Sequence, residues 1–206
     1  MRRRDIFWLV FGSFTAVPLR AMNFREYPAT PASSISGAVS RDGLVVAAVA
    51  MTAAAEQHNY FQVTFARKGF FPVYISLENR ASAERFFIRR EDIGVFSGGR
   101  ERTNSGDVVT GRSKVGERVM LASSLALSVG GELIAAHMMV RATEIRQNII
   151  KKEFRSVTLG PRELSHGFVY LPIPLAAAEA GSLVLRIRAV KMADGEPIDF
   201  EFRLSI

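Results

Sequence analysis

The sequence predicts a mainly β protein, an antiparallel β-sandwich into which one amphipathic α-helix is inserted. After residue 44, short runs of aromatic and β-branched residues alternate with turn-forming residues, a pattern typical of sandwiches. One segment, about 118–155, departs from this pattern. It is rich in Ala, Leu and Met, and its apolar residues recur near helical spacing.

Composition agrees with one folded domain. The chain has 206 residues, of which 48% are hydrophobic and 23% charged, proportions found in globular rather than disordered proteins. Cysteine is absent, which excludes disulfides, thiolate metal sites and a catalytic cysteine. The net charge is +7, and residues 1–32 contribute five Arg against Asp5 and Glu26. The remaining chain carries only +4, which does not favour nucleic acid as a partner.

The N-terminus has the pattern of an export signal. Arg2, Arg3 and Arg4 precede an apolar stretch at 6–19, which is too short for a comfortable transmembrane helix. We interpret residues 1–32 as an export signal or N-terminal anchor, with small-residue cleavage candidates at 30–32 and 36–38. A buried N-terminal strand is the alternative. Exported, periplasmic or envelope-associated localisation is therefore expected, with residues 33–43 as a Pro-, Ser- and Gly-rich linker and residues 44–206 as the domain.

Eight strands are expected from the apolar patterns. Residues 44–51 are continuously apolar, as in a strand buried on both faces, whereas 199–206 alternate strictly. Turn signals occur at Gly160-Pro161 and Asp194-Gly195. The Gly-rich stretch 97–117 is expected to be a loop that can hold an irregular hairpin. The other expected strands are 60–65, 71–79, 85–89 continuing into 93–96, 156–159, 167–172 and 183–190.

A helix is expected from about residue 131 to 154. Ile134, Met138, Ile145 and Ile149 recur near helical spacing, and the basic residues of this region exceed the acidic ones. One interpretation is a polar face over a core-covering helix. The other is contact with an acidic partner or an anionic membrane. The candidate contact residues are Ile145, Ile149, Arg141, Arg146, Lys151 and Lys152.

Four segments together resemble a known family. They are Pro72–Arg80, Phe86–Ile93, Val157–Pro161 and Gly167–Pro172, and their order resembles telokin-like, immunoglobulin-type domains of secreted and lipid-anchored bacterial proteins. The family's usual Pro-Gly turn is inverted here, and the resemblance covers residues 60–96 and 156–206. It implies an exported, immunoglobulin-like antiparallel β-sandwich, mostly without enzymatic activity, and it supplies no catalytic residue. Asn79, at a strand end, is expected to bond nearby backbone.

No motif of catalytic or cofactor chemistry is found in the sequence. His58, His137 and His166 lie in three different segments without metal-ligand spacing. A nucleophile elbow, a P-loop and a dinucleotide fingerprint are missing. Glu91 and Asp92 follow Arg89 and Arg90, which favours a solvated ion-pair turn over acid–base catalysis. We therefore expect no enzyme activity, cofactor, metal, small-molecule substrate or nucleic acid.

Three functional hypotheses follow from these patterns. The first is a non-catalytic extracytoplasmic protein that binds another protein of the cell envelope or helps an assembly form, using sheet edges or the 97–140 region. The second is a peripheral membrane protein held by the basic helix. The third is an enzyme of unrecognised type, which would require a deep pocket with convergent titratable groups.

Overall fold

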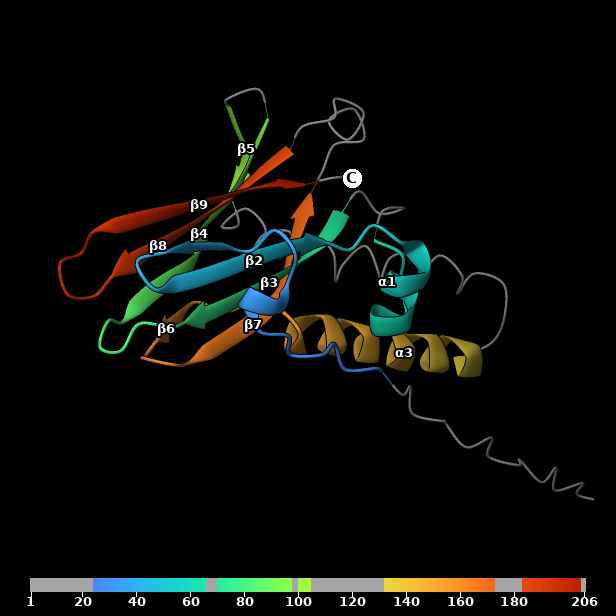
Figure 1. Cartoon of the computed structure of the whole chain (residues 1–206). Coiled ribbons are helices and arrows are strands. Elements are labelled where there is room, and N and C mark those ends of the chain that lie inside the picture. Colours follow the sequence, from blue (N-terminus) through green and yellow to red (C-terminus); the bar gives the residue numbers. More distant parts are fainter. Residues whose placement is uncertain (1–23, 66–69, 98–99, 105–131, 173–182, 205–206) are drawn as a thin grey trace, which may run out of the picture.

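The chain is described by a computed structural model covering residues 24–65, 70–97, 100–104, 132–172 and 183–204. Its strands form two antiparallel sheets (Figure 1). Sheet A has the order β1 (Val39–Arg41), β2 (Leu44–Ala50), β3 (Phe70–Asn79) and β7 (Leu164–Pro172). Sheet B has the order β5 (Arg100–Asn104), β4 (Phe86–Ser97), β8 (Leu183–Lys191) and β9 (Pro197–Leu204), and β6 (Val157–Leu159) also pairs with β4. The prediction of a mainly β, antiparallel protein is confirmed.

One hydrophobic core joins the two sheets. Along β9, Ile198, Phe200, Phe202 and Leu204 are buried, while Asp199, Glu201 and Arg203 point away from the core. β2 shows the other pattern, because Leu44 to Ala47 are all buried. Each fully buried large apolar side chain contributes about 1.5–3 kcal/mol. The alternating and continuous apolar runs of the sequence therefore correspond to strands covered on one face and on both faces.

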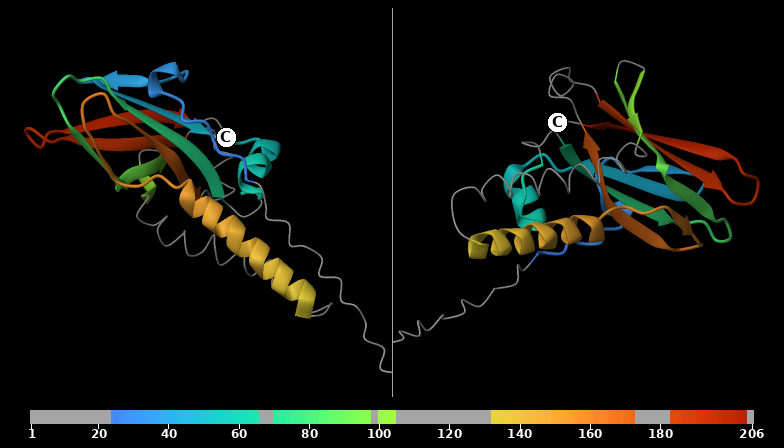
Figure 2. Two further views of the ribbon diagram at one scale, coloured as in Figure 1. Left: turned by 90° about the horizontal axis from the view of Figure 1, so that it is seen from below. Right: turned by 180° about the vertical axis from the view of Figure 1, so that it is seen from behind.

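Within the described residues, two α-helices pack beside sheet A. They are α1 (Ala54–Phe61) and α3 (Glu132–Lys151), and a short 3-10 helix η1 spans Ala32–Ser34. Figure 2 shows α3 lying next to α1 and extending past the end of the sheets. The helix predicted at 131–154 is thus confirmed, whereas residues 118–131 of the predicted insertion lie outside the described residues.

The strand predicted at 60–65 is wrong. Residues 54–61 form α1, in which Gln57 and Phe61 lie one helical turn apart and are buried. Gln57 fixes the end of the helix, since its Nε2 donates to the Met51 carbonyl at 2.7 Å and its Oε1 accepts the Phe65 N–H at 2.8 Å. The Ala-rich start of α1 favours a helix. The aromatic residues that suggested a strand instead fill the space between α1 and sheet A.

The interval 33–43 is not a linker. It contains part of η1 and the whole of β1, which pairs with β2 from Val39 opposite Val46 to Arg41 opposite Leu44. The turn of this hairpin is Asp42-Gly43, which adopt left-handed φ values of 51° and 85°. Ser36 and Gly37 form a separate turn before β1. Residues 24–32 also pack against the folded body, whereas residues 1–23 of the predicted leader lie outside the described part.

Asn79 connects two turns, β3–β4 and β6–β7, each of which runs between sheet A and sheet B. Its Nδ2 donates to the carbonyls of Glu84 and Gly160, both at 2.8 Å, and its Oδ1 accepts the Ala81 N–H at 2.9 Å. The side chain is buried. The expected backbone bonding of Asn79 is confirmed, and it reaches across to the β6–β7 turn as well as along its own turn.

Gly167 permits a close approach of the chain that follows α3. Phe168 forms a parallel bridge with Glu153, since the Phe154 N–H donates to the Phe168 carbonyl and the Phe168 N–H to the Lys152 carbonyl, both at 2.8 Å. A Cβ on Gly167 would lie 2.6 Å from the Cα of Phe154. Glycine is therefore required here for packing. The bridge also covers part of the edge of β7.

Candidate functional site

The side of α3 that faces the sheets belongs to the hydrophobic core. Ala142, Ile145, Asn148 and Ile149 are buried, at spacings of three, four and seven residues. Ile145 and Ile149 are only 9% and 7% exposed. These two residues, predicted as candidates for partner or membrane contact, thus pack inside this chain. The Ile134 and Met138 side chains lie outside the described part.

Outside this buried side, α3 is exposed and carries both apolar and basic residues. Met139 is 53% exposed and Val140 44% exposed, which is unusual for large apolar side chains on the same turn. Arg141, Arg146 and Lys151 are exposed on the same helix, with the polar Thr143 and Gln147 between them. Three of the six predicted contact residues are therefore accessible to a partner. We call Met139, Val140, Arg141, Arg146 and Lys151 the outer face of α3.

Lys152 is buried between other segments of this chain and is not available for contact with a partner. Its Nζ donates to the Arg25 carbonyl at 2.6 Å and to the Tyr60 carbonyl at 2.7 Å, and it lies 5.3 Å from the centre of the Phe61 ring. Burial lowers the pKa of its ammonium group. Lys152 thus joins three separate segments through backbone oxygens, a role that its position in a basic run did not indicate.

Lys151 is exposed but has a partner. Its Nζ lies 2.6 Å from the Oε1 of Glu26, and this hydrogen bond lowers the pKa of the Glu26 carboxyl. Both side chains are more than 60% exposed, so the pair contributes little to stability. It does hold the segment that begins at Phe24 beside the C-terminal end of α3.

A small pocket lies where this segment meets α3 and β7. Its volume is about 100 Å³, and it is lined by Glu26, Tyr27, Lys151, Lys152, His166, Gly167 and Phe168. Small-molecule sites are usually about 300–1,000 Å³. The two lysines are already bonded to Glu26 and to backbone carbonyls. The pocket therefore has neither the size nor the unengaged charge of a typical substrate site.

A buried ion pair lies on the other side of the α3 terminus. Arg90 and Glu153 are 2.5 Å apart. Nearby, the Tyr170 hydroxyl donates to the Ile149 carbonyl at 3.0 Å, and burial raises the pKa of this phenol well above its usual range. The neighbouring residues Arg89 and Asp92 form an ion pair at 2.8 Å at the surface, as predicted, but they lie within strand β4 and not in a turn. The inward direction of Arg90 was missed, because adjacent arginines look alike in a sequence.

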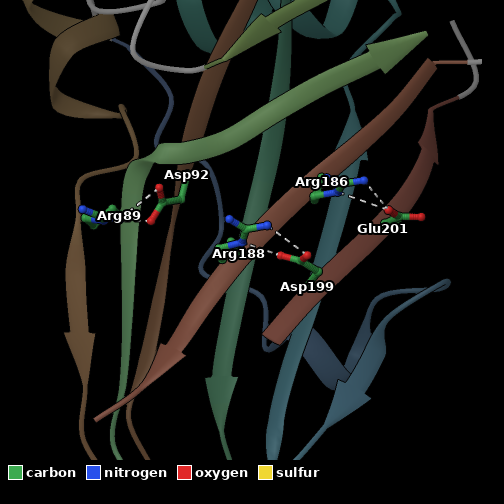
Figure 3. A network of polar contacts seen from close by, with 6 residues as sticks. All are labelled: Arg89, Asp92, Arg186, Arg188, Asp199 and Glu201. Carbon is green, nitrogen blue, oxygen red and sulfur yellow. Dashed lines mark hydrogen bonds and ion pairs between the residues drawn. The ribbon is translucent and has the colours of Figure 1, made fainter. Parts of the chain in front are cut away.

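The outer surface of sheet B is charged and internally paired (Figure 3). Arg186 lies opposite Glu201 and Arg188 opposite Asp199 in the β8–β9 register. The nearest contacts are 3.1 Å and 2.8 Å, and the Arg188 hydrogen bond lowers the pKa of Asp199. Because Arg186 and Arg188 each lie beside an acidic side chain, this part of the surface offers less net charge to a partner than the outer face of α3.

The described residues hold neither a metal-ligand cluster nor a membrane-spanning helix. No group of three or more His, Cys, Asp or Glu side chains there is arranged to hold a metal ion. His58 and His166 are exposed in separate elements, and the His137 side chain lies outside the described part. Within that same part, no helix combines the length and the apolar character needed to cross a bilayer. Comparisons with known protein families and with proteins of curated function give no match.

Proposed function

We propose that this chain is a non-catalytic, exported component of the cell envelope, an immunoglobulin-like sandwich that binds a partner protein through the outer face of α3. The observation that carries the proposal is the division of α3 into two sides. Ile145 and Ile149 stabilise the fold, whereas Met139, Val140, Arg141 and Arg146 are exposed together. Met and Arg are enriched at protein interfaces.

The charge of the outer face favours an acidic partner. Arg141 directly follows the exposed Met139 and Val140, and Arg146 lies seven residues, or two helical turns, after Met139. The one acidic residue nearby on the helix, Glu144, is half-buried. Charges at the rim of an interface increase the association rate and exclude partners of the same sign. An acidic protein surface with an apolar centre is the partner chemistry that fits these residues.

A non-catalytic role is supported by what the titratable groups near α3 do. Lys152 is held by two backbone carbonyls, Glu26 by Lys151, and Arg90 by Glu153. Catalytic groups need a free position from which to exchange protons with a substrate. Here the same groups connect segments of the fold, and the adjoining pocket is small.

An anionic membrane is a second candidate, favoured by the place where the described chain begins. Four residues separate the apolar run 6–19 from Phe24, and the segment after Phe24 lies against Lys151 and Lys152. Five Cα steps span at most about 18 Å. If the apolar run is held in a membrane, the basic end of α3 is brought near its surface, where Arg and Lys bind anionic lipid.

Site-specific crosslinking of the full chain tests the proposal. A photo-crosslinking residue at Gln147, on the exposed side of α3, should capture an acidic protein in the native envelope. The same residue at Ser82, in the β3–β4 turn, is the control. Reversing the charges with Arg141→Glu and Arg146→Glu should abolish the Gln147 product. The matched reversal of two other exposed arginines, Arg85→Glu just before β4 and Arg203→Glu in β9, should not.

Flotation with liposomes separates the two candidates. Binding that requires anionic lipid, weakens with salt and is lost in the α3 variant supports the membrane and contradicts the protein partner. If neither crosslinking nor flotation depends on Arg141 and Arg146, the outer face of α3 is not a binding surface and the proposal fails.

A further inference from the structure

Residues 24–34 cross the outer side of sheet A, and we call this segment the strap. Tyr27 lies at its centre, with ring centroids 4.8 Å from Tyr60, 4.5 Å from Tyr74 and 4.9 Å from Phe168. These three rings come from α1, β3 and β7. Tyr27 thus fills a position where two strands and a helix meet, a contact that aromatic pairs stabilise beyond simple burial.

The strap is also hydrogen-bonded along β3. The Ser76 hydroxyl donates to the Thr30 carbonyl at 2.7 Å, the Ser33 N–H donates to Glu78 Oε2 at 3.0 Å, and the Tyr74 hydroxyl donates to the Pro28 carbonyl at 3.3 Å. Tyr74, Ser76 and Glu78 alternate along the strand and so face one side of the sheet. Every outward residue over this length of β3 is bonded to the strap.

Both ends of the strap are fixed as well. At one end, Ala32 is fully buried and packs with Val45 and Ala47 of β2. At the other, the Arg25 carbonyl accepts a hydrogen bond from the largely buried ammonium of Lys152. Without the strap, Lys152 would lose one of its two carbonyl partners, and Ser76 would lose its acceptor. Buried polar groups left without partners are strongly destabilising.

These contacts limit where an export leader can be removed. The small-residue sequences at 30–32 and 36–38 resemble cleavage sites, but a cut at either would detach most or all of the strap. We propose that the mature protein retains the strap, and that any processing of the leader ends before Phe24. Small residues upstream of that point include Ala16 and Ala21. The folded body then begins no more than a few residues after the apolar run.

The N-terminal residue of the exported protein tests this directly. The full chain is expressed in a bacterial host, and the protein from its envelope is analysed by intact mass and N-terminal sequencing. We expect the first residue at or before position 24, and an uncleaved chain also meets this expectation. A folded envelope protein that begins at 33 or 39 would overturn the proposal.

Variants of the full chain test the structural reason. Tyr27→Ala should lower the melting temperature by more than about 5 °C, whereas Ser36→Ala, at an exposed position just beyond the strap, should leave it within about 1 °C. A shortened chain that begins at Phe24 should melt like the full domain, and one that begins at Ser33 should melt more than about 10 °C lower or fail to fold. Equal melting temperatures for the two shortened chains would show that the strap is dispensable and would contradict the inference.

Discussion

The carboxylate of Glu153 lies 2.5 Å from the guanidinium of Arg90, and their side chains are only 4% and 8% exposed. A break in the β4–β8 register between Ile88 and Ile93 makes this pair possible. Four residues of β4 lie opposite one residue of β8 there, so the strand bulges and Arg90 turns inward. Since Glu153 lies two residues after the end of α3, the pair joins the end of the inserted helix to sheet B.

Removing one member of this pair should be strongly destabilising. Glu153→Gln leaves Arg90 buried without a counter-charge, and we expect a loss of about 3–5 kcal/mol in the free energy of unfolding. Urea denaturation measures the loss. Asp92→Asn, which breaks the neighbouring exposed pair, should cost less than about 1 kcal/mol. Equal effects of the two changes would show that Arg90 and Glu153 are accessible to water.

Asn79→Ala should weaken the connection between the β3–β4 and β6–β7 turns, which both run between the two sheets. The change removes Nδ2, which bonds the carbonyls of Glu84 and Gly160, and Oδ1, which bonds the Ala81 N–H. We expect a loss of about 2–4 kcal/mol, measured by chemical denaturation. Asn59→Ala, at an exposed position of α1, is the matched control, and its effect should stay within about 0.5 kcal/mol.

Gly167→Ala should disturb the bridge between β7 and residues 152–154. The added Cβ would lie 2.6–2.7 Å from backbone atoms of Phe154, so the backbone must move apart. We expect faster amide hydrogen exchange at Phe154 and Phe168 and a loss of about 1–3 kcal/mol. Gly160→Ala meets only the flexible carboxylate of Glu163. Its effect should be clearly smaller, and a reversed order would refute this role of Gly167.

Stability should fall at high pH partly because of Tyr27. Burial raises the pKa of its phenol from about 10 to about 12. Between these values the unfolded chain loses the proton first, so the free energy of unfolding decreases as pH rises. Tyr27→Phe keeps the ring and should reduce the loss between pH 8 and pH 11 by about 0.5–1 kcal/mol, a value lowered for partial exposure. Tyr74 and Tyr170 also have raised pKa values, so the Tyr27→Phe variant should still lose some stability between the two pH values. Urea unfolding midpoints of the natural chain and of the variant at pH 8 and pH 11 measure the difference.

Local sequence patterns predicted most strands correctly, but they predicted the structure of residues 33–43 and 60–65 wrongly. The alternation in β9 and the continuous run in β2 were sufficient, because each pattern states how many faces of the strand are buried. The run 60–65 misled, since aromatic residues suit both a strand and the buried side of a short helix. The interval 33–43 misled for a related reason, because Ser and Gly mark turns within a folded segment as well as a linker.

The candidate surface was only partly predictable. Helical spacing placed Ile145 and Ile149 on one side of α3, but spacing alone does not say whether that side meets the core or a partner. The assembled core decides it, because both residues are buried in it. Lys151 and Lys152 show the same limit of sequence patterns, because they are adjacent and chemically alike, yet Lys151 is exposed and Lys152 is buried. The ion-pair partner of Arg90 lies 63 residues away along the chain, and the ring partners of Tyr27 lie 33 to 141 residues away. Such distances are beyond the reach of any local pattern.

By itself, the sequence determined that the chain is mainly β, where most strands lie, that one long helix follows β5, and that Asn79 bonds backbone at the end of its strand. These follow from periodicity and turn chemistry, which act over a few neighbouring residues. Only the tertiary structure decided which side of α3 is covered, that Arg90 points inward and that residues 24–34 belong to the fold. Each of these depends on what lies across a layer, and burial is a property of the assembled layers rather than of one segment.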